Sequence, residues 1–321
     1  MLVAVLSGGR SSEHEVSLRS GASVAAGLRE AGHEAVEVLI GRDGRWSRDG
    51  VGLELVPGEG LLGADVVFPA LHGPFGEDGA VQGLLECLEV PYVGSDVLAS
   101  AICMDKLTLK GLLALHGLPQ VAFVQAGADG WRDRVAQMGL PVWVKPSRLG
   151  SSVGISKVVS VEALEVAVSH AQRHDPRVIV EASAGGREVE CSVLGNEEVE
   201  TSLPGEIDAH ADWYDYEAKY SAGGMDLVVP ARIDERAAGR VRELAARSFR
   251  LAGCSGLARC DFFVEPDGTV LVNEINTIPG FTETSVYSKL FEASGIGYAD
   301  LCDRLVALAI ERHRRARTYE F

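Results

Sequence analysis

Short apolar runs alternate with longer segments of helical periodicity in the first hundred residues. The first apolar run ends at a glycine pair, and the spacing of Ser12 and Glu15 then matches a capping box at the start of a helix. That helix is predicted to run to about Glu30 and to end at Gly32. The predicted strands of this region are residues 2–6, 35–40 and 64–68. Strands that alternate with helices in this way predict a parallel α/β layer.

The pattern changes after residue 98 and again after residue 183. A helix through Met104 and Leu107 is predicted to end near Gly117, and helices are also expected over residues 161–174 and 237–251. The strands expected in the middle group are residues 121–124, 142–145 and 155–158. We therefore expect three units, which are residues 1–98, 99–183 and 184–321.

Asp267-Gly268 separates two apolar runs, a pattern that favours a β-hairpin. A two-residue turn at this point would place Asp261 opposite Glu274, and side-chain alternation would put Asn276 on the same face. Three oxygen ligands in this arrangement suit a hard cation such as Mg²⁺ that bridges substrate phosphates. The alternative interpretation is a solvated hairpin face with unrelated acids.

Lys145 ends an apolar strand, where an ammonium group is costly to bury unless an anion meets it. The glycine- and serine-rich loop that follows, residues 147–152, offers backbone donors for phosphate oxygens. Lys106 and Lys219 are further candidates for the same ligand, although each lysine alone is more often a surface residue. The chain has no GxxxxGK(S/T) phosphate loop, and its GxGxxG match at residues 58–63 precedes a strand instead of opening a helix. P-loop and dinucleotide-binding folds are therefore excluded.

Composition and charge narrow the class of protein. The 321 residues are 46% hydrophobic and 24% charged, which is typical of a soluble globular protein with a sizeable core. A formal net charge of −16, with no basic stripe except a short C-terminal arginine run, argues against nucleic acid as a partner. The six cysteines are scattered singly, which predicts reduced core residues. The N-terminal apolar run is too short for a signal peptide or a membrane span, so we expect a cytoplasmic protein with no membrane partner.

The spaced polar motifs together resemble those of the D-alanine:D-alanine ligases of the ATP-grasp superfamily, and the resemblance extends from end to end. The matching motifs lie at residues 8–17, 71–73, 76–79, 104–106, 144–147, 150–154, 214–220, 259–261 and 273–280. The resemblance implies an α/β fold that opens with a parallel α/β substrate-binding domain at residues 1–98. A two-part ATP-grasp fold of α+β character would follow, with a central subdomain at 99–183. The C-terminal subdomain at 184–321 would carry the metal site and a lid loop at 212–225.

The resemblance also implies a reaction. The expected small-molecule ligands are ATP and two D-alanine molecules, with two Mg²⁺ ions as cofactors and Mn²⁺ as the alternative metal. The carboxylate of the first D-alanine would attack the γ-phosphate of ATP. The amine of the second would attack the resulting acylphosphate and give the dipeptide of the bacterial cell wall. The family also suggests a homodimer.

Each role in the family falls on a matching residue of this chain. The implied catalytic residues are Glu13, Ser151, Tyr220, Arg259 and Gly280. The implied D-alanine contacts are His72 and Ser285, the ATP contacts are Lys106, Lys145, Glu181, Glu188, Lys219 and Asn273, and the metal ligands are Asp261, Glu274 and Asn276. Ser151 and Tyr220 would join Glu13 in a hydrogen-bonded triad. Arg259 and the Gly280 backbone N–H would form an oxyanion hole.

Two rival functions stay open at this point. An ATP-grasp ligase with another acceptor, D-lactate or D-serine, would share most of these motifs, although Tyr220 resembles the dipeptide-forming enzymes more than the lactate-using variants. A nucleotide-binding sensor without turnover is the rival from another class, and the intact Glu13, Ser151 and Lys219 argue against it. A scaffold protein would explain none of the spaced polar residues.

Overall fold

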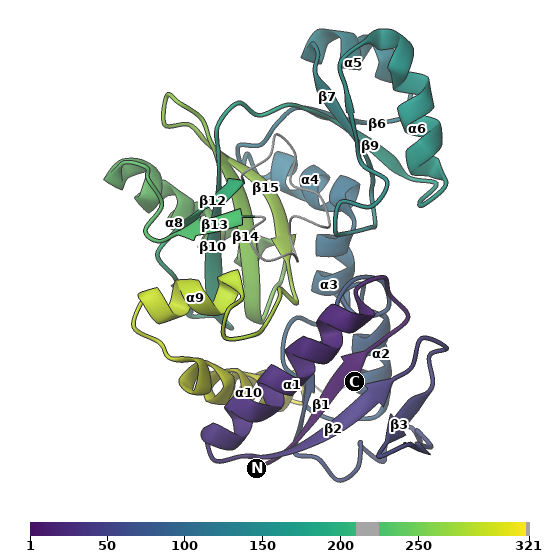
Figure 1. Ribbon diagram of the computed structural model, residues 1–321, viewed down its shortest axis with the longest axis vertical. Coiled ribbons are helices and arrows are strands. Elements are labelled where there is room, and N and C mark those ends of the chain that lie inside the picture. The colour runs from purple at the N-terminus through teal and green to yellow at the C-terminus, as the bar shows by residue number, and fades with distance from the viewer. Residues whose placement is uncertain (210–224, 319–321) are drawn as a thin grey trace.

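The structure of the protein is a computed structural model that describes residues 1–209 and 225–318. Three sheets organise the described residues, and Figure 1 shows them as separate layers, with the first at the bottom of the view. Their strands fall at residues 2–69, 123–182 and 187–276. Lys219, Tyr220 and almost all of the expected lid loop at 212–225 lie outside the described residues.

The first sheet has the strand order β4-β3-β2-β1-β5. Its strands are β1 (Leu2–Gly8), β2 (Glu34–Ile40), β3 (Trp46–Arg48), β4 (Val51–Gly52) and β5 (Val66–Pro69). β1 pairs in parallel with both β2 and β5, so the predicted parallel layer is present. Val3 and Val5 pack into the core on the side of α1 (His14–Glu30), whereas Ala4 and Leu6 pack toward α2 (Ala80–Cys87). Helices on both faces explain why the run is continuously apolar. The antiparallel β3 and β4 were not expected, because strands this short carry little periodicity.

The start of α1 differs from the sequence prediction. Glu13 occupies the N-cap position, and no side chain makes a capping hydrogen bond there, so the predicted capping box is wrong. The backbone N–H of Glu13 donates instead to Ser11 Oγ at 3.0 Å. The helix ends at Glu30, as predicted. Its first turn therefore leaves the Glu13 carboxylate available for contacts outside the helix.

The predicted helix through Met104 is two helices, α3 (Val97–Met104) and α4 (Lys106–Leu115). The chain breaks at Asp105, which has extended backbone angles and accepts a hydrogen bond from the Thr108 backbone N–H at 3.2 Å. An aspartate in this conformation is a favourable N-cap. The break makes Lys106 the first residue of a new helix and so fixes where its side chain begins.

The second sheet has the order β6-β9-β7-β8, with every pair antiparallel. Its strands are β6 (Phe123–Gln125), β7 (Val142–Pro146), β8 (Ser156–Val158) and β9 (Val178–Ala182), and α5 (Trp131–Met138), the 3-10 turn Val161–Ala163 and α6 (Leu164–Gln172) accompany them. Along β7, Val142 and Val144 are buried while Trp143 and Lys145 are half-buried. The period of two therefore turns Lys145 away from the small core of this unit.

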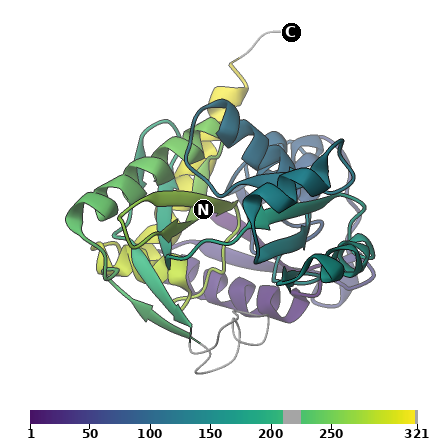
Figure 2. The ribbon, with the colours of Figure 1, turned by 90° about the horizontal axis from the view of Figure 1, so that it is seen from above.

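The third sheet has the order β13-β12-β10-β14-β15, with β11 also paired to β10. Its strands are β10 (Arg187–Gly195), β11 (Val199–Thr201), β12 (Gly205–Ala209), β13 (Met225–Val228), β14 (Gly256–Val264) and β15 (Val270–Asn276). The long helix α8 (Glu235–Leu251) packs against β10, β14 and β15, and the view from above shows it along the outer side of the sheet (Figure 2). Asp234 caps this helix by accepting from the Ala237 N–H at 2.7 Å. The other face of the sheet is left for α9 (Val286–Ala293) and the site.

The last helix, α10 (Tyr298–Ala316), returns to the first unit and lies beside α1 (Figure 1). Leu301 and Leu305 share one buried cluster with Val5 of β1, Val24 of α1 and Phe68 of β5. The range 184–321 thus contains a helix that packs on the range 1–98. The three expected domain ranges stay predictions.

Five of the six cysteines are buried, as expected for reduced core residues, but Cys87 is exposed. All six are free thiols, and the sulfur atoms of Cys103 and Cys254 lie 3.6 Å apart in the core. Among the helices that the structure describes, none is both long and apolar enough to cross a lipid bilayer.

We predict that Glu206→Gln destabilises the protein in a pH-dependent way. Glu206 on β12 is 4% exposed and forms ion pairs with Arg232 at 2.7 Å and with Arg187. The hydrogen bonds from Arg232 come first among the causes that outweigh burial and lower the pKa of the Glu206 carboxyl from 4.5 to about 2. A carboxyl with a depressed pKa stabilises the fold above its unfolded pKa, and this contribution is lost as pH falls through the folded pKa.

Both arginines are half-exposed, so solvent screens the two ion pairs. We therefore expect Glu206→Gln to lower the free energy of unfolding at pH 7 by about 2 kcal/mol. Urea unfolding of both proteins between pH 7 and pH 3 checks this, and the difference should shrink below about pH 4.5. Glu200→Gln, which removes an exposed partner of Arg304, is the matched control and should change stability by less than about 0.5 kcal/mol. A pH-independent loss for Glu206→Gln would contradict the ion-pair explanation.

Candidate active site

A cleft of about 630 Å³ lies where the three units meet. Every predicted site residue that the structure describes lines this cleft. These are Glu13, His72, Lys106, Lys145, Ser151, Glu181, Glu188, Arg259, Asp261, Asn273, Glu274, Asn276, Gly280 and Ser285. The sequence motifs thus converge in space, while the individual roles of these residues stay predictions.

The turn of the β14–β15 hairpin is longer than predicted, but the predicted pairing of Asp261 with Glu274 is present. The backbone N–H of Glu265 donates to the Thr269 carbonyl at 2.9 Å, so the turn is longer than the predicted two residues. The register then shifts between Phe262 and Asp261, which places Asp261 opposite Glu274 after all. A β-bulge at Asn273 therefore compensates for the longer turn. Asn273 and Glu274 are both half-buried and both line the cleft.

The predicted metal ligands lie together at the end of this hairpin. The Asn276 amide donates to Asp261 Oδ2 at 2.9 Å, and Lys106 Nζ lies 3.8 Å from Glu274 Oε2. Two carboxylates and one amide oxygen are donors that fit a hard cation. The described residues contain no group of three His, Cys, Asp or Glu side chains placed to hold a metal by themselves. An ion held by Asp261, Glu274 and Asn276 would complete its coordination with substrate oxygens, as Mg²⁺ commonly does at phosphates.

Arg259 is held by two carboxylates. Its guanidinium donates to both oxygens of Asp261 at 2.7 Å and lies 2.8 Å from Glu190 Oε2. Burial lowers the pKa of Arg259, but Asp261 and Glu190 outweigh it and hold that pKa above its usual value. Glu190 was not predicted as a site residue. Its signal in the sequence is the alternation of Glu188 and Glu190 along an otherwise apolar strand, which puts both acids on one face.

Glu13 and Ser151 join the first unit to the second. Ser151 Oγ donates to Glu13 Oε1 at 2.5 Å, across 138 positions of sequence. Ser151 and Ser152 both have positive φ angles, 53° and 59°, which serine rarely adopts. Strained backbone of this kind concentrates at functional sites. The Ser151–Glu13 part of the predicted triad is present, and Tyr220 lies outside the described residues.

His72 is buried next to Glu13. Its Nδ1–H donates to the Ile278 carbonyl at 3.1 Å, and Nε2 lies 2.9 Å from Ser20 Oγ. Glu77 Oε1 is 3.7 Å from Nδ1. Burial lowers the pKa of His72, but the contact with Glu77 outweighs it, so the pKa lies above the ordinary value. Glu77 belongs to a motif that the sequence identified, but no role had been assigned to it.

Ser285 and Gly280 lie side by side in the lining of the cleft. Ser285 is the N-cap residue of α9, and its Oγ accepts from the Thr282 backbone N–H at 3.0 Å. A Cβ atom at Gly280 would come within 3.3 Å of Ser285 Oγ. Glycine at this position therefore lets the backbone approach the serine closely.

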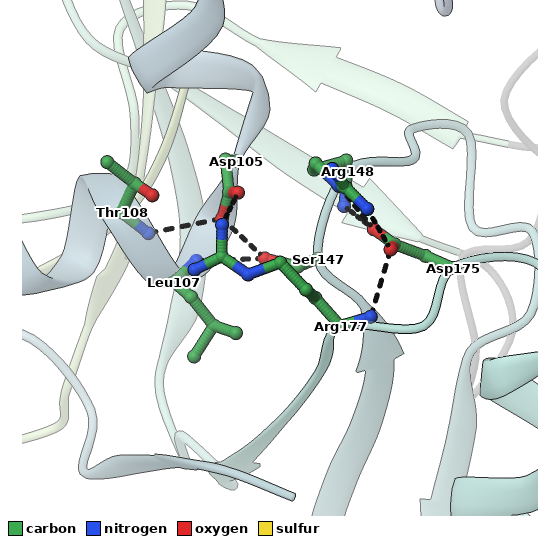
Figure 3. Close-up of polar contacts among 7 residues, drawn as sticks. All are labelled: Asp105, Leu107, Thr108, Ser147, Arg148, Asp175 and Arg177. Carbon is green, nitrogen blue, oxygen red and sulfur yellow. Dashed lines mark hydrogen bonds and ion pairs between the residues drawn. The ribbon is translucent and has the colours of Figure 1, made fainter.

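The base of the serine loop is anchored to α4 by a charged network (Figure 3). Asp105 accepts from Ser147 Oγ at 2.7 Å and also pairs with Arg177. Arg148 pairs with Asp175 at 2.7 Å. The network fixes the residues that immediately precede the loop bearing Ser151 and holds them against the helix that starts with Lys106.

Comparison with known proteins agrees with this arrangement. The family profile described as "D-ala D-ala ligase N-terminus" matches residues 2–56 and 54–95, and "D-ala D-ala ligase C-terminus" matches residues 112–307. A D-alanine–D-alanine ligase of Deinococcus radiodurans is 47% identical over 96% of this chain and 98% of its own length. One of Solibacter usitatus is 46% identical over 99% and 98%.

Solved structures show the same likeness. The D-alanine-D-alanine ligase from Coxiella burnetii has a TM-score of 0.90 at 36% identity, covering 99% of this chain and 96% of that one. The VanG D-Ala:D-Ser ligase from Enterococcus faecalis has a TM-score of 0.86 at 34% identity, covering 96% and 99%. Fold and site thus define an enzyme of the ADP-forming ligase class with an α/β ATP-grasp fold. The chain belongs to the D-alanine–D-alanine ligase family.

Proposed function

We propose that the protein uses ATP to join two D-alanine molecules into D-alanyl-D-alanine, for peptidoglycan precursor synthesis. The observation that carries this proposal is the meeting of three kinds of group in one cleft. An acid from the first unit, Glu13, contacts a strained serine loop from the second. The Asp261 and Glu274 carboxylates come from the third. This arrangement supports the proposal because it would bring amino-acid recognition and phosphate chemistry side by side.

The first half-reaction needs a carboxylate to approach a triphosphate. Glu13 would bind the ammonium group of the first D-alanine, since a buried carboxylate favours a cationic partner. His72, whose raised pKa favours the protonated form, would lie near the substrate carboxylate. That carboxylate attacks the γ-phosphorus, which gives an acylphosphate and ADP. Bound divalent ions, held by Asp261, Glu274 and Asn276, would offset the repulsion between the two anions.

The second half-reaction forms the peptide bond. The amine of the second D-alanine attacks the acylphosphate carbonyl, loses a proton and expels inorganic phosphate. Arg259 and the Gly280 backbone N–H would stabilise the oxyanion that forms on the carbonyl oxygen. Glu190 and Asp261 keep the guanidinium in place for that role. Ser285 would bind the carboxylate of the second substrate.

We expect the purified protein to release phosphate from ATP only when Mg²⁺ and D-alanine are present. Removing the metal with EDTA should abolish the release, because carboxylate and triphosphate then repel each other, and added Mg²⁺ should restore it. Mass spectrometry should detect D-alanyl-D-alanine as the product. Phosphate release that does not depend on D-alanine, or that gives no dipeptide, would contradict the proposal.

D-Serine and D-lactate are the rival acceptors, and the likeness to VanG gives a reason to test D-serine. D-Alanine should be the preferred second substrate in a competition assay with equal concentrations of the three.

We further propose two metal ions per active site, Mg²⁺ with Mn²⁺ as the alternative metal, together with a cytoplasmic location and a homodimeric state. Metal titration, cell fractionation and sedimentation would test these points.

A further inference from the structure

Three charged side chains that are far apart in the sequence meet in the wall of the cleft. Lys110 Nζ lies 3.0 Å from Glu181 Oε1, and Lys145 Nζ lies 2.6 Å from Glu181 Oε2. The side chains of Lys110 and Glu181 are only 1% and 2% exposed, whereas that of Lys145 is 15% exposed. One buried carboxylate thus holds two ammonium groups, one on each oxygen.

The Glu181 carboxyl is ionised at neutral pH. Burial raises the pKa of the Glu181 carboxyl, but the two lysines outweigh it and hold that pKa at about 2. Burial lowers the pKa of Lys110, while the pKa of Lys145 is raised because Glu181 outweighs its burial. A carboxylate this deeply buried is stable only while a cation stays in contact with it.

The two lysines differ in what they can reach. Lys145 lines the cleft, and the family resemblance implies that it contacts ATP. Lys110 projects from α4 between Leu107 and Leu113, which are both buried, and it is not among the described residues that line the cleft. A ligand in the cleft can therefore contact Lys145 but not Lys110.

We propose that Lys110 is a positioning residue that frees Lys145 for ATP, by remaining as the counter-ion of Glu181 when the Lys145 ammonium turns to phosphate. This inference rests on the proposed function, because it assumes that the ligand in the cleft is a nucleotide triphosphate. Without Lys110, Lys145 would be the remaining lysine at Glu181. Moving Lys145 to phosphate would then leave a buried charge unpaired, so ATP would bind against the cost of breaking that pair.

The test is a set of Kd measurements by calorimetry on the full chain, with ATP or adenosine, in Mg²⁺ and without D-alanine. Lys110→Met should weaken ATP binding by about tenfold or more, since one buried pair must break. The Kd for adenosine should change by less than about threefold, because adenosine has no phosphate that could attract the Lys145 ammonium. Lys289→Met, which removes a lysine from an exposed pair with Glu292, is the matched control and should bind both ligands as the wild type does.

Two double variants separate a positioning role of Lys110 from a general disturbance of the fold. In Lys145→Met, adding Lys110→Met should cost less than about threefold in ATP affinity, since Lys110 acts through Lys145. In Glu181→Gln, adding Lys110→Met should likewise cost less than about threefold in ATP affinity, because no carboxylate then holds Lys145. This double variant has no unpaired buried carboxylate, and so it remains informative even if Lys110→Met folds poorly.

The inference is overturned if Lys110→Met reduces the affinity for ATP equally in the wild-type protein and in Lys145→Met. It is also overturned by a loss of ATP affinity from Lys110→Met in the Glu181→Gln background that is as large as its loss in the otherwise wild-type protein. If wild-type protein binds no ATP, the proposed function itself fails. If wild-type protein binds ATP and Lys110→Met binds it equally well, only the role of Lys110 fails.

Discussion

Asp261→Asn is expected to reduce kcat for the joining of D-alanine by about a thousandfold or more, the loss typical of removing a preorganised charge from an active site. The Asp261 carboxylate accepts two hydrogen bonds from Arg259 and one from Asn276. It is also one of the oxygen donors proposed for the divalent ion. Asparagine has only one acceptor oxygen and would place an N–H₂ donor against the guanidinium donors. The contact with Arg259 and the binding of the divalent ion are therefore impaired together. Phosphate release and dipeptide formation at saturating substrates measure the effect.

Asp267→Asn provides the matched control for this experiment. Asp267 lies in the turn of the same hairpin and is exposed, and its carboxylate accepts from the Thr269 backbone N–H at 2.9 Å. Asparagine can make a similar turn contact, so kcat should stay within about twofold of the wild type. Asp261→Asn that keeps more than about a tenth of the wild-type kcat would remove Asp261 from the site as we describe it.

Glu13→Gln is expected to lower kcat/KM for D-alanine by about a hundredfold to a thousandfold, with ATP affinity unchanged. Glu13 is buried, lines the cleft and accepts a 2.5 Å hydrogen bond from Ser151. A neutral amide keeps the shape of the side chain and loses the attraction for the substrate ammonium. Steady-state kinetics with D-alanine varied, together with calorimetric ATP binding, would separate the two sites.

Glu15→Gln, two residues further along the same helix, is the control for Glu13→Gln. Glu15 is exposed and pairs with Arg42 on the surface at 2.9 Å. Surface pairs of this kind contribute little, so its kcat/KM should remain close to the wild-type value. A parallel fall in ATP affinity for Glu13→Gln would instead indicate a general disturbance of the cleft.

The β14–β15 hairpin shows which features could be predicted from the sequence and which could not. A two-residue turn at Asp267-Gly268 predicted that Asp261 faces Glu274, and the structure confirms that pairing. The turn length was wrong, and an unforeseen bulge at Asn273 compensated for it. Turn length and bulges depend on backbone geometry over a few residues, which the hydrophobic pattern does not record. The pairing was therefore predicted correctly, although the backbone path assumed for it was not.

Other misses share a physical cause. Lys110 occupies the apolar stripe of α4 with Leu107 and Leu113, so its burial could have been inferred, but its partner Glu181 lies in another unit. Glu190 likewise contacts Arg259, which is distant in sequence, whereas Glu77 contacts His72, which is near in sequence within the same unit. Family motifs identified residues that would touch substrates. The side chains that contact those residues became visible only in the folded structure.

The packing of α10 on the first sheet has a consequence for how the chain matures. During synthesis β1 and α1 emerge first, yet Val5 and Val24 share their buried cluster with Leu301 and Leu305. Until the last helix has left the ribosome, one apolar flank of the N-terminal layer has no cover and is open to water or to other nascent chains. The N-terminal layer is therefore fully covered only after α10 has been synthesised, and a chain truncated before α10 would expose this apolar surface and be prone to aggregate.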